Sequence, residues 1–269
     1  MPIDQKNRIF TDFLNNSRFE IYHHGYRELD SAWRGGENRP PYNRLYCITG
    51  GSGTVKTSRA VIKLYPGNSY LFPINQPVDF STETTLQKFF MHFSLQVFSL
   101  TDIFEICEPH IFSVKTGRRI KKIMKFSGAS CRDMLQSEST LLELVSEFIP
   151  ESCIFPGMQK KKRKFEPALK LIEKMPMGSL KLALLSRECG MSAVYFSAEF
   201  KKTFDINVKD YIIKKIMQKA KCRLSWGAES VKDTARSLGF NDEYYFSRFF
   251  KKHTGYTPSF YRNHTVQVF

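Results

Sequence analysis

This sequence lacks the features that are typical of membrane-spanning proteins, of secreted proteins and of proteins with a structural metal site. No run of about 18 or more apolar residues occurs, so no segment is predicted to span a membrane. The first ten residues hold no apolar stretch of the secretory type, and no secretory signal is expected. No two cysteines share the Cys-x-x-Cys spacing of a zinc or redox motif. We therefore predict a cytoplasmic protein without a cofactor, in which six scattered cysteines are reduced and mostly fill the core: Cys47, Cys107, Cys131, Cys153, Cys189 and Cys222.

Acidic residues are scarce in the second part of the chain. Residues 157–269 hold 23 Lys and Arg against 10 Asp and Glu, whereas residues 1–156 hold 18 against 16. Basic charge gathered on one domain is typical of a protein that binds a polyanion, because Lys and Arg displace the counterions of phosphates. An ordinary basic surface and an anionic membrane face remain alternatives at this point.

Turn residues and hydrophobic periodicity divide the chain. Short strand-like runs up to about residue 95, beginning at Arg18, Arg44, Val61 and Ser69, favour an antiparallel sandwich or barrel. A helical pattern follows up to residue 152. Pro156-Gly and the five basic residues 160–164 then indicate an exposed linker. We predict a first domain over 1–155, a basic linker over 156–164 and a second, basic domain over 165–269.

The glycine-rich segment 50–57 superficially matches a phosphate loop. Val55 stands where the second required glycine would be, and no helical pattern follows. We therefore interpret this segment as a hairpin turn.

A segment of the basic part occurs twice. Tyr195-Phe-Ser-Ala-Glu-Phe-Lys-Lys returns as Tyr245-Phe-Ser-Arg-Phe-Phe-Lys-Lys, 50 residues later, and Gly190 corresponds to Gly239. Two copies of one supersecondary unit explain this repetition most simply. The copies are predicted to be helix-turn-helix units over about 179–204 and 230–254.

In the second copy Ser230 can cap a first helix, Gly239 can end it, and Asn241 or Asp242 can cap a second helix. Pro258 suits the start of a closing helix. The side chains predicted to be buried are Val231, Ala235, Leu238, Tyr245, Phe246, Phe249 and Phe250.

In the first copy the matching residues are Ser179 as the cap, Leu182, Leu185 and Cys189 as inward side chains, Gly190 at the turn, and Ser192 as the second cap. Residues 208–224 between the copies are predicted to form one helix, with Ile212, Ile216 and Ala220 packed and Lys214, Lys215 and Lys219 facing out. Two ordinary helical hairpins are the alternative to DNA-binding units. Duplication together with basic charge favours DNA, because second helices of this kind fit the major groove.

The second copy resembles a known signature. The pattern Ala235-x-x-x-Gly239-Phe240, then Tyr245-Phe-Ser-Arg, then Gly255-Tyr-Thr-Pro258-x-x-Tyr-Arg262 is similar to that of AraC/XylS-type transcription regulators. The resemblance covers roughly residues 165–264, and Leu64-Tyr-Pro-Gly-x-x-Tyr-Leu-Phe-Pro73 is similar to the family's cupin-like barrel.

This resemblance implies an α+β multidomain protein with an N-terminal cupin-like β-barrel, following helices, and an all-α double helix-turn-helix domain. It implies a sequence-specific transcription factor that controls genes for the use of a small molecule, commonly a sugar, sensed by the barrel. The implied partners are promoter or operator DNA, the effector, RNA polymerase and a second copy of the chain.

By the resemblance, the second helix of each unit enters the major groove. Arg248 is the strongest candidate for reading a base, with a phosphate contact or a surface ion pair as alternatives. Ala198 takes the matching place in the first copy, where no bidentate contact to guanine can form. Four lysines are expected to contact phosphates: Lys201, Lys202, Lys251 and Lys252. Four aromatic residues are expected to lie in the core: Tyr195, Phe196, Phe249 and Phe250. The predicted DNA-binding residues are Ser192, Ala193, Val194, Ser197, Ala198, Lys201, Lys202, Asn241, Glu243, Tyr244, Ser247, Arg248, Lys251 and Lys252.

A barrel also raises the alternative of a metal enzyme. That chemistry needs two or three converging His and a carboxylate, whereas the strand at residues 42–47 has no His-x-His pair. The adjacent His23 and His24 would point to opposite faces of a strand. We predict no catalytic or metal site. A third possibility is a small-molecule-binding protein whose basic helical domain reads no sequence.

An effector site in the barrel mouth is expected by analogy of fold. Each candidate could instead be a core or rim residue. The candidates are Tyr22, Trp33, Tyr42, Arg44, Tyr46, Tyr70 and His92.

The helical stretch between about residues 131 and 152 carries a broad apolar stripe. We predict that it forms a homodimer contact, with packing on its own barrel alone as the alternative, and the two are not exclusive. The stripe consists of Leu141, Val145 and Phe148, flanked by Leu142 and Ile149.

Overall fold

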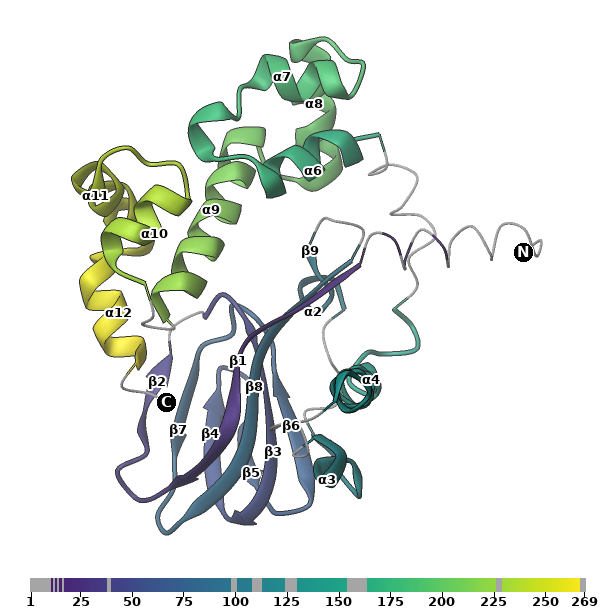
Figure 1. The fold of residues 1–269 in the computed structure, drawn as a ribbon, viewed down its shortest axis with the longest axis vertical. Helices are drawn as coiled ribbons and strands as arrows, with labels where there is room; N and C mark the ends of the chain where they lie inside the picture. The colour runs from purple at the N-terminus through teal and green to yellow at the C-terminus, as the bar shows by residue number, and fades with distance from the viewer. Residues whose placement is uncertain are drawn as a thin grey trace. The chain divides into compact units, whose positions relative to one another are not determined.

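The computed structural model describes residues 11, 13, 15, 17–37, 40–97, 101–107, 113–123, 130–153, 164–225 and 229–266. They fall mainly into two compact units, one within residues 18–154 and one within residues 155–269 (Figure 1). The predicted linker at 156–164 lies outside the described residues, except for Lys164. In the part of the chain so described, no helix has both the length and the apolar character that crossing a bilayer requires.

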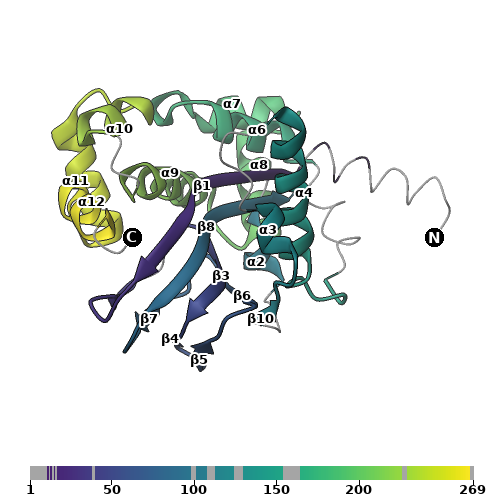
Figure 2. The same cartoon turned by 60° about the horizontal axis from the view of Figure 1, so that its bottom comes forward.

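The N-terminal unit is built on two antiparallel sheets, as the short strand-like runs predicted (Figures 1 and 2). One sheet has the strand order β1-β8-β3-β6-β10, with β9 also paired to β8. Its strands are β1 (Arg18–Leu29), β3 (Asn43–Gly51), β6 (Asn68–Phe72), β8 (Leu86–Val97), β9 (Thr101–Asp102) and β10 (Ser113–Lys115). The other has the order β2-β7-β4-β5. Its strands are β2 (Arg34–Glu37), β4 (Gly53–Thr57), β5 (Val61–Leu64) and β7 (Val78–Ser81).

Side-chain alternation explains how the smaller sheet is oriented. In β7, Val78 and Phe80 are buried and Asp79 is exposed, which is the period of two expected for a sheet with one face in the core.

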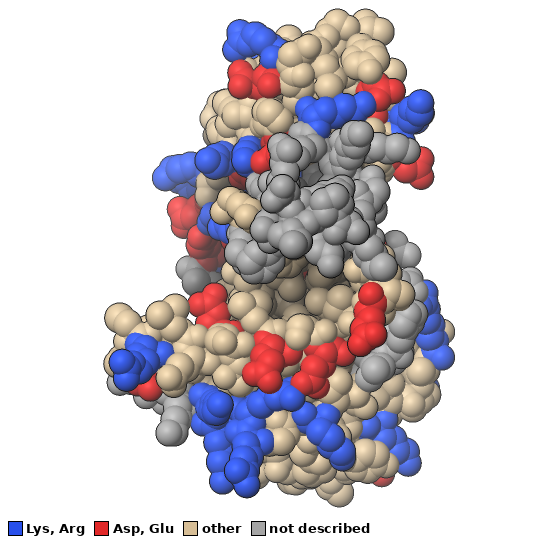
Figure 3. All heavy atoms as spheres, turned by 90° about the vertical axis from the view of Figure 1, so that its right-hand side faces the viewer, with Lys and Arg blue, Asp and Glu red and all other residues tan. Residues whose placement is uncertain are grey.

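The long strand β8 is buried along almost all of its length, because it lies between β1 and β3 in the larger sheet. Both signs of charge gather on the face of this unit that Figure 3 shows, in keeping with the near balance of charges in residues 1–156.

The segment at residues 50–57 is not a hairpin, so that interpretation was wrong. Strand β3 ends at Gly51 in the larger sheet and pairs with β6 and β8. Strand β4 begins at Gly53 in the smaller sheet and pairs with β5 and β7. The glycines therefore carry the chain from one sheet to the other, a long-range arrangement that turn chemistry alone does not reveal.

The helices described in this unit are α2 (Ile103–Ile106), α3 (Arg119–Ile123) and α4 (Cys131–Ser146). Ser130 caps α4 and exchanges hydrogen bonds with Asp133 in a capping box. Leu141, Val145 and Phe148 are buried within their own chain. The structure thus supports packing of these three side chains within their own domain, and a dimer contact through this helix stays a prediction.

Two of the six cysteines are joined. Cys107 follows α2, Cys153 lies beyond α4, and a disulfide links them, with their Cα atoms 5.8 Å apart. The prediction of reduced cysteines was therefore wrong for this pair, because a separation of 46 residues carries no spacing signal. Cys47 and Cys222 are free and buried, as predicted for cysteines of the core. Cys131 is free and exposed.

The described elements of the C-terminal unit are helices, and they share one buried cluster. Its elements are α6 (Glu166–Lys174), the 3-10 turn η2 (Met177–Ser179), α7 (Leu182–Glu188), α8 (Ala193–Phe204), α9 (Val208–Ser225), α10 (Val231–Ser237), α11 (Glu243–Thr254) and α12 (Pro258–Val266). Helix α9 contacts α6 and α8 on one side of the sequence and α10, α11 and α12 on the other. In Figure 1 it lies between α6–α8 and α10–α12, and its buried side chains join the two halves into one core.

Lysines on α9 do not all face outward. Lys214 is exposed as predicted, but the side chain of Lys215 is only 8% exposed and its Nζ lies 3.1 Å from Glu173 Oε1. Lys219 is half-buried, and its Nζ lies 3.2 Å from Glu173 Oε2. The prediction was wrong for these two because both ammonium groups reach a carboxylate on α6, a partner that the α9 sequence does not show.

Candidate nucleic-acid interface

The second helix-turn-helix unit is formed by α10 and α11. Ser230 caps α10 and accepts a hydrogen bond from the Asp233 backbone N at 3.0 Å. The turn passes through Gly239, whose φ is +84°. Asp242, and not Asn241, caps α11 by accepting from the Tyr244 backbone N at 2.8 Å. These local bonds set the direction of α11.

The first unit is formed by α7 and α8 and differs from the prediction at its start. Ser179 lies in η2, and Lys181 is the N-cap of α7 without a side-chain hydrogen bond. Leu182, expected to face inward, is exposed, whereas Leu185 is fully buried. Ser192 caps α8 as predicted and accepts from the Tyr195 backbone N at 3.3 Å.

Matching phenylalanines anchor the two outer helices. Phe196 and Phe200 of α8, and Phe246 and Phe250 of α11, are fully buried. Because each pair is spaced four residues apart, it places one face of its helix in the core and turns the other toward solvent. Corresponding residues of the repeat therefore occupy corresponding faces.

Most predicted DNA contacts lie on these outward faces. The side chains of Val194 and Tyr244 are 83% and 78% exposed. Ala193, Ser197, Glu243 and Ser247 are half-buried. The other predicted residues are exposed: Ser192, Ala198, Lys201, Lys202, Asn241, Arg248, Lys251 and Lys252. The fold thus brings each set together on one helix, and their contact with DNA stays a prediction.

Two tyrosines that the sequence placed in the core are half exposed. Tyr195 is 54% and Tyr245 is 50% exposed, at equivalent positions of α8 and α11. The prediction of a buried Tyr195 and a buried Tyr245 was wrong, because the neighbouring phenylalanines fill the core and leave the tyrosines at its edge. Their repetition at the same position was the signal that could have identified them as part of the outer face.

A close backbone approach helps to hold the two helix-turn-helix units together. The Met177 backbone N donates to Leu238 O at 3.3 Å, so the start of the first unit touches the turn of the second. A Cβ at Gly239 would lie 2.4 Å from Pro176 Cβ, so any side chain there would push the units apart. Gly239 is thus required both by its positive φ and by this contact.

The last residue of the basic segment does not face solvent freely. The ammonium group of Lys164 pairs with the carboxylate of Glu199 on α8. This hydrogen bond holds the pKa of Glu199 below its ordinary value. Lys164 therefore contacts the helix that carries the first outward face, a role that sequence reasoning missed.

The predicted effector residues lie together but are packed in the N-terminal core. Tyr42, Arg44 and His92 are fully buried, and Trp33, Tyr46 and Tyr70 are nearly so, while Tyr22 is half-buried. The Tyr42 ring stacks on His92 with centroids 4.7 Å apart. Burial, with the nearby charges of Lys88 and Arg44, lowers the pKa of His92 well below its ordinary value, so this ring is neutral at physiological pH.

An internal lysine lies at the centre of this group. Lys88 is buried, and its Nζ lies 3.7 Å from the centroid of the Tyr46 ring and 4.5 Å from that of Trp33. Such cation–π contacts stabilise an ammonium group away from water. The aromatic side chains in this group thus contact protein groups on the inside of the unit.

The histidines of the N-terminal unit that a metal enzyme could use are dispersed. The rings of His23 and His92 have centroids 6.3 Å apart, and His24 packs near Phe89. Over the ranges that the structure describes, no group of three or more His, Cys, Asp or Glu side chains could hold a metal ion.

Comparison with known proteins agrees with the helical geometry. Residues 185–264 match the family model of a helix-turn-helix domain. The chain is 21% identical over 268 residues to the Msm operon regulatory protein of Streptococcus mutans, covering 94% of this chain and 96% of that protein. It is 33% identical over 72 residues to the raffinose operon transcriptional regulatory protein RafR of Pediococcus pentosaceus, covering 27% of this chain and 26% of that protein.

A similar fold occurs in a solved structure. ToxT from Vibrio cholerae O395, bound to (E)-4-(8-methylnaphthalen-1-yl)but-3-enoic acid, matches with a TM-score of 0.52 over 91% of this chain and 98% of that chain. The identity of 10% limits this likeness to the fold. Together these findings confirm the predicted resemblance. The C-terminal part is an AraC-type helix-turn-helix domain, and the chain is a DNA-binding transcription regulator.

Proposed function

We propose that this regulator reads its operator with α8 and α11, each lying in one of two adjacent major-groove segments. The observation that carries this proposal is the repeated outward face, anchored by Phe196 and Phe200 in one copy and by Phe246 and Phe250 in the other. Because both units share one core through α9, the two helices are presented to DNA as a rigid pair.

The two helices have unequal chemistry for base recognition. Helix α11 presents Arg248, whose planar guanidinium can bond to both acceptors of a guanine. Helix α8 presents Val194 and Ala198, which offer apolar contact to thymine methyl groups, and Ser197, whose hydroxyl suits either base type, but no side chain for a bidentate contact to guanine. We therefore expect α11 to select bases strictly and α8 to select them loosely, while Lys201, Lys202, Lys251 and Lys252 meet phosphates and set the position on the duplex.

The N-terminal unit is proposed to sense a small molecule of the carbohydrate class. The similarity to a protein named for a raffinose operon supports this class. We also propose the domain division 1–155, 156–164 and 165–269, action as a homodimer, and contact with RNA polymerase at promoters. With the α4 stripe buried, Met134 and Leu135 are apolar side chains of that helix that remain exposed for a second copy.

Replacement of Arg248 tests the assignment of roles. Arg248→Ala should weaken binding to the cognate site by about 1–3 kcal/mol and relax the preference at one base position. Lys251→Ala should weaken binding to cognate and random duplexes equally, because a phosphate contact carries no sequence information. Fluorescence anisotropy with the full chain and both duplexes measures these effects.

Arg248→Lys is the matched control, since it keeps the charge but loses the planar fork. It should bind random DNA as the wild type does and still lose discrimination at the same base. Equal losses on every sequence for Arg248→Ala and Lys251→Ala would show that Arg248 contacts only phosphate.

A further inference from the structure

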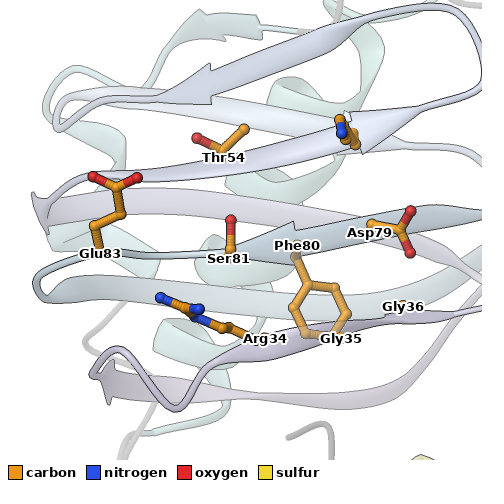
Figure 4. A pocket seen from close by; sticks show the side chains of 9 residues that line it. Arg34, Gly35, Gly36, Thr54, Asp79, Phe80, Ser81 and Glu83 are labelled. Atoms are coloured by element: carbon orange, nitrogen blue, oxygen red, sulfur yellow. The ribbon is translucent and has the colours of Figure 1, made fainter.

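A polar groove of about 500 Å³ lies on the smaller sheet of the N-terminal unit. None of the seven predicted effector residues lines it. Its wall consists of Arg34, Gly35 and Gly36 of β2, Thr54 and Lys56 of β4, and Asp79, Phe80, Ser81 and Glu83 on or just after β7 (Figure 4). Its volume falls in the range typical of small-molecule sites, roughly 300–1,000 Å³.

Strand register places the polar side chains of the groove in two rows. Arg34 and Thr54 both pair with Ser81, and Gly36 and Lys56 both pair with Asp79. Residues two apart on a strand share a face, so both rows lie on the same side of the sheet. The residues between them, Val55 and Phe80, are buried, which identifies the face with the two rows as the outer one.

The missing side chain at Gly36 makes room for the carboxylate of Asp79. A Cβ built there would lie 2.2 Å from Asp79 Oδ1, so the carboxylate of Asp79 occupies the space above this glycine. Figure 4 shows Asp79 toward one end of the groove and Glu83 toward the other, with Ser81 between them. Acceptors are therefore spread along the groove and are not gathered at one point.

The charged side chains of the groove are exposed. Across the described part of the chain, the side chains of Arg34, Lys56, Asp79 and Glu83 make no hydrogen bond or ion pair. Two are cations and two are anions, so a charged ligand would meet as many like charges as opposite ones. A neutral ligand rich in hydroxyl groups can donate to both carboxylates and accept from Arg34, Lys56 and the hydroxyls of Thr54 and Ser81.

We infer that this groove binds a neutral saccharide, with Asp79 and Lys56 at one end and Arg34 and Glu83 at the other. The inference rests on the proposed sensing of a carbohydrate and moves the site from the packed interior to the outer face of the sheet. Charge-assisted hydrogen bonds to ligand hydroxyls supply the specificity, because no exposed aromatic side chain lines the groove.

Thermal unfolding of the full chain with glucose, sucrose and raffinose tests the inference. At a hundred times its Kd, a bound saccharide should raise the Tm of the N-terminal unit by about 5–10 °C. Lys56→Ala and Asp79→Asn should weaken that Kd at least tenfold, and Gly36→Ala should do so by forcing the Asp79 carboxylate aside. Lys63→Ala is the matched control, since Lys63 pairs with Thr54 on the neighbouring strand β5 but does not line the groove.

The possible outcomes distinguish the proposed groove from the proposed sensing of a carbohydrate. If a saccharide raises the Tm of the wild type and of Lys56→Ala, Asp79→Asn and Gly36→Ala alike, the groove is overturned and carbohydrate sensing stands. If none of the three saccharides shifts the Tm, both the groove and the proposed carbohydrate sensing are overturned. Stronger binding of glucose 6-phosphate than of glucose would overturn the neutral class. The Tm of each variant without ligand, expected to match the wild type, shows that it is folded.

Discussion

Glu173→Gln should lower the free energy of unfolding of the C-terminal unit by about 3–5 kcal/mol, because it leaves a buried cation without its counter-charge. The Glu173 side chain is only 16% exposed and lies 3.1 Å from the Nζ of Lys215, itself 8% exposed. Burial alone would raise the pKa of Glu173, but the charges of Lys215 and Lys219 outweigh it, and the pKa lies below its ordinary value of 4.5. Since a lowered pKa stabilises the folded state above that value, this contribution should be lost as the pH falls through the folded pKa.

Urea unfolding followed by far-ultraviolet circular dichroism measures the change. Glu166→Gln is the matched control, because Glu166 lies on the same helix and pairs with the exposed Lys170 at 2.6 Å. Removing such an i,i+4 surface pair should cost only about 0.3–0.5 kcal/mol. Adding Lys215→Met to Glu173→Gln should recover most of the loss. Equal small effects of Glu173→Gln and Glu166→Gln would contradict the buried ion pair.

Opening the disulfide should lower the stability of the N-terminal unit by about 4 kcal/mol, from the entropy that a closed loop of this length removes from the unfolded chain. The bond connects Cys107 and Cys153, 46 residues apart, and encloses α3 and α4. Denaturant unfolding of the wild type with and without dithiothreitol measures this difference. A variant with both Cys107→Ser and Cys153→Ser should match the reduced wild type and respond no further to reductant.

Thiol titration of the denatured chain gives a direct control. Four of the six cysteines are free, so four thiols should react before reduction and six after it. Cys131→Ser removes an exposed free thiol and should leave both the stability and its response to reductant unchanged. Six reactive thiols in the oxidised protein would show that the bond is not formed.

Local patterns in the sequence predicted the course of the helical domain and part of its core. The sequence placed Phe196, Phe246 and Phe250 in the core correctly, because both copies follow one amphipathic period. Caps at Ser192 and Ser230 followed from side-chain chemistry near the helix starts. Ser179 failed as a cap because the chain there forms η2, where Pro176 meets the turn at Gly239.

Features that depend on residues far apart in the chain could not be predicted. The partner of Lys215 lies 42 positions earlier, and the disulfide joins residues 46 apart. Alternation along a strand shows which side chains point inward but not whether the interior is filled, so Tyr42, Arg44 and His92 were taken for pocket residues. The outer groove depends on the register of β2, β4 and β7, and its only local sign was the pair Gly35-Gly36.

Selection of bound sequences from a pool of random duplexes by the full chain tests the central claim most directly. Two short blocks should be enriched, roughly one helical turn or about 10 base pairs apart, because two rigidly joined helices enter successive major-groove segments. One block should be strict and contain a guanine that Arg248→Ala no longer selects, and the other should be looser and rich in thymine. A pool that binds but shows no enriched sequence, for the wild type as for Arg248→Ala, would contradict the claim that α8 and α11 read DNA.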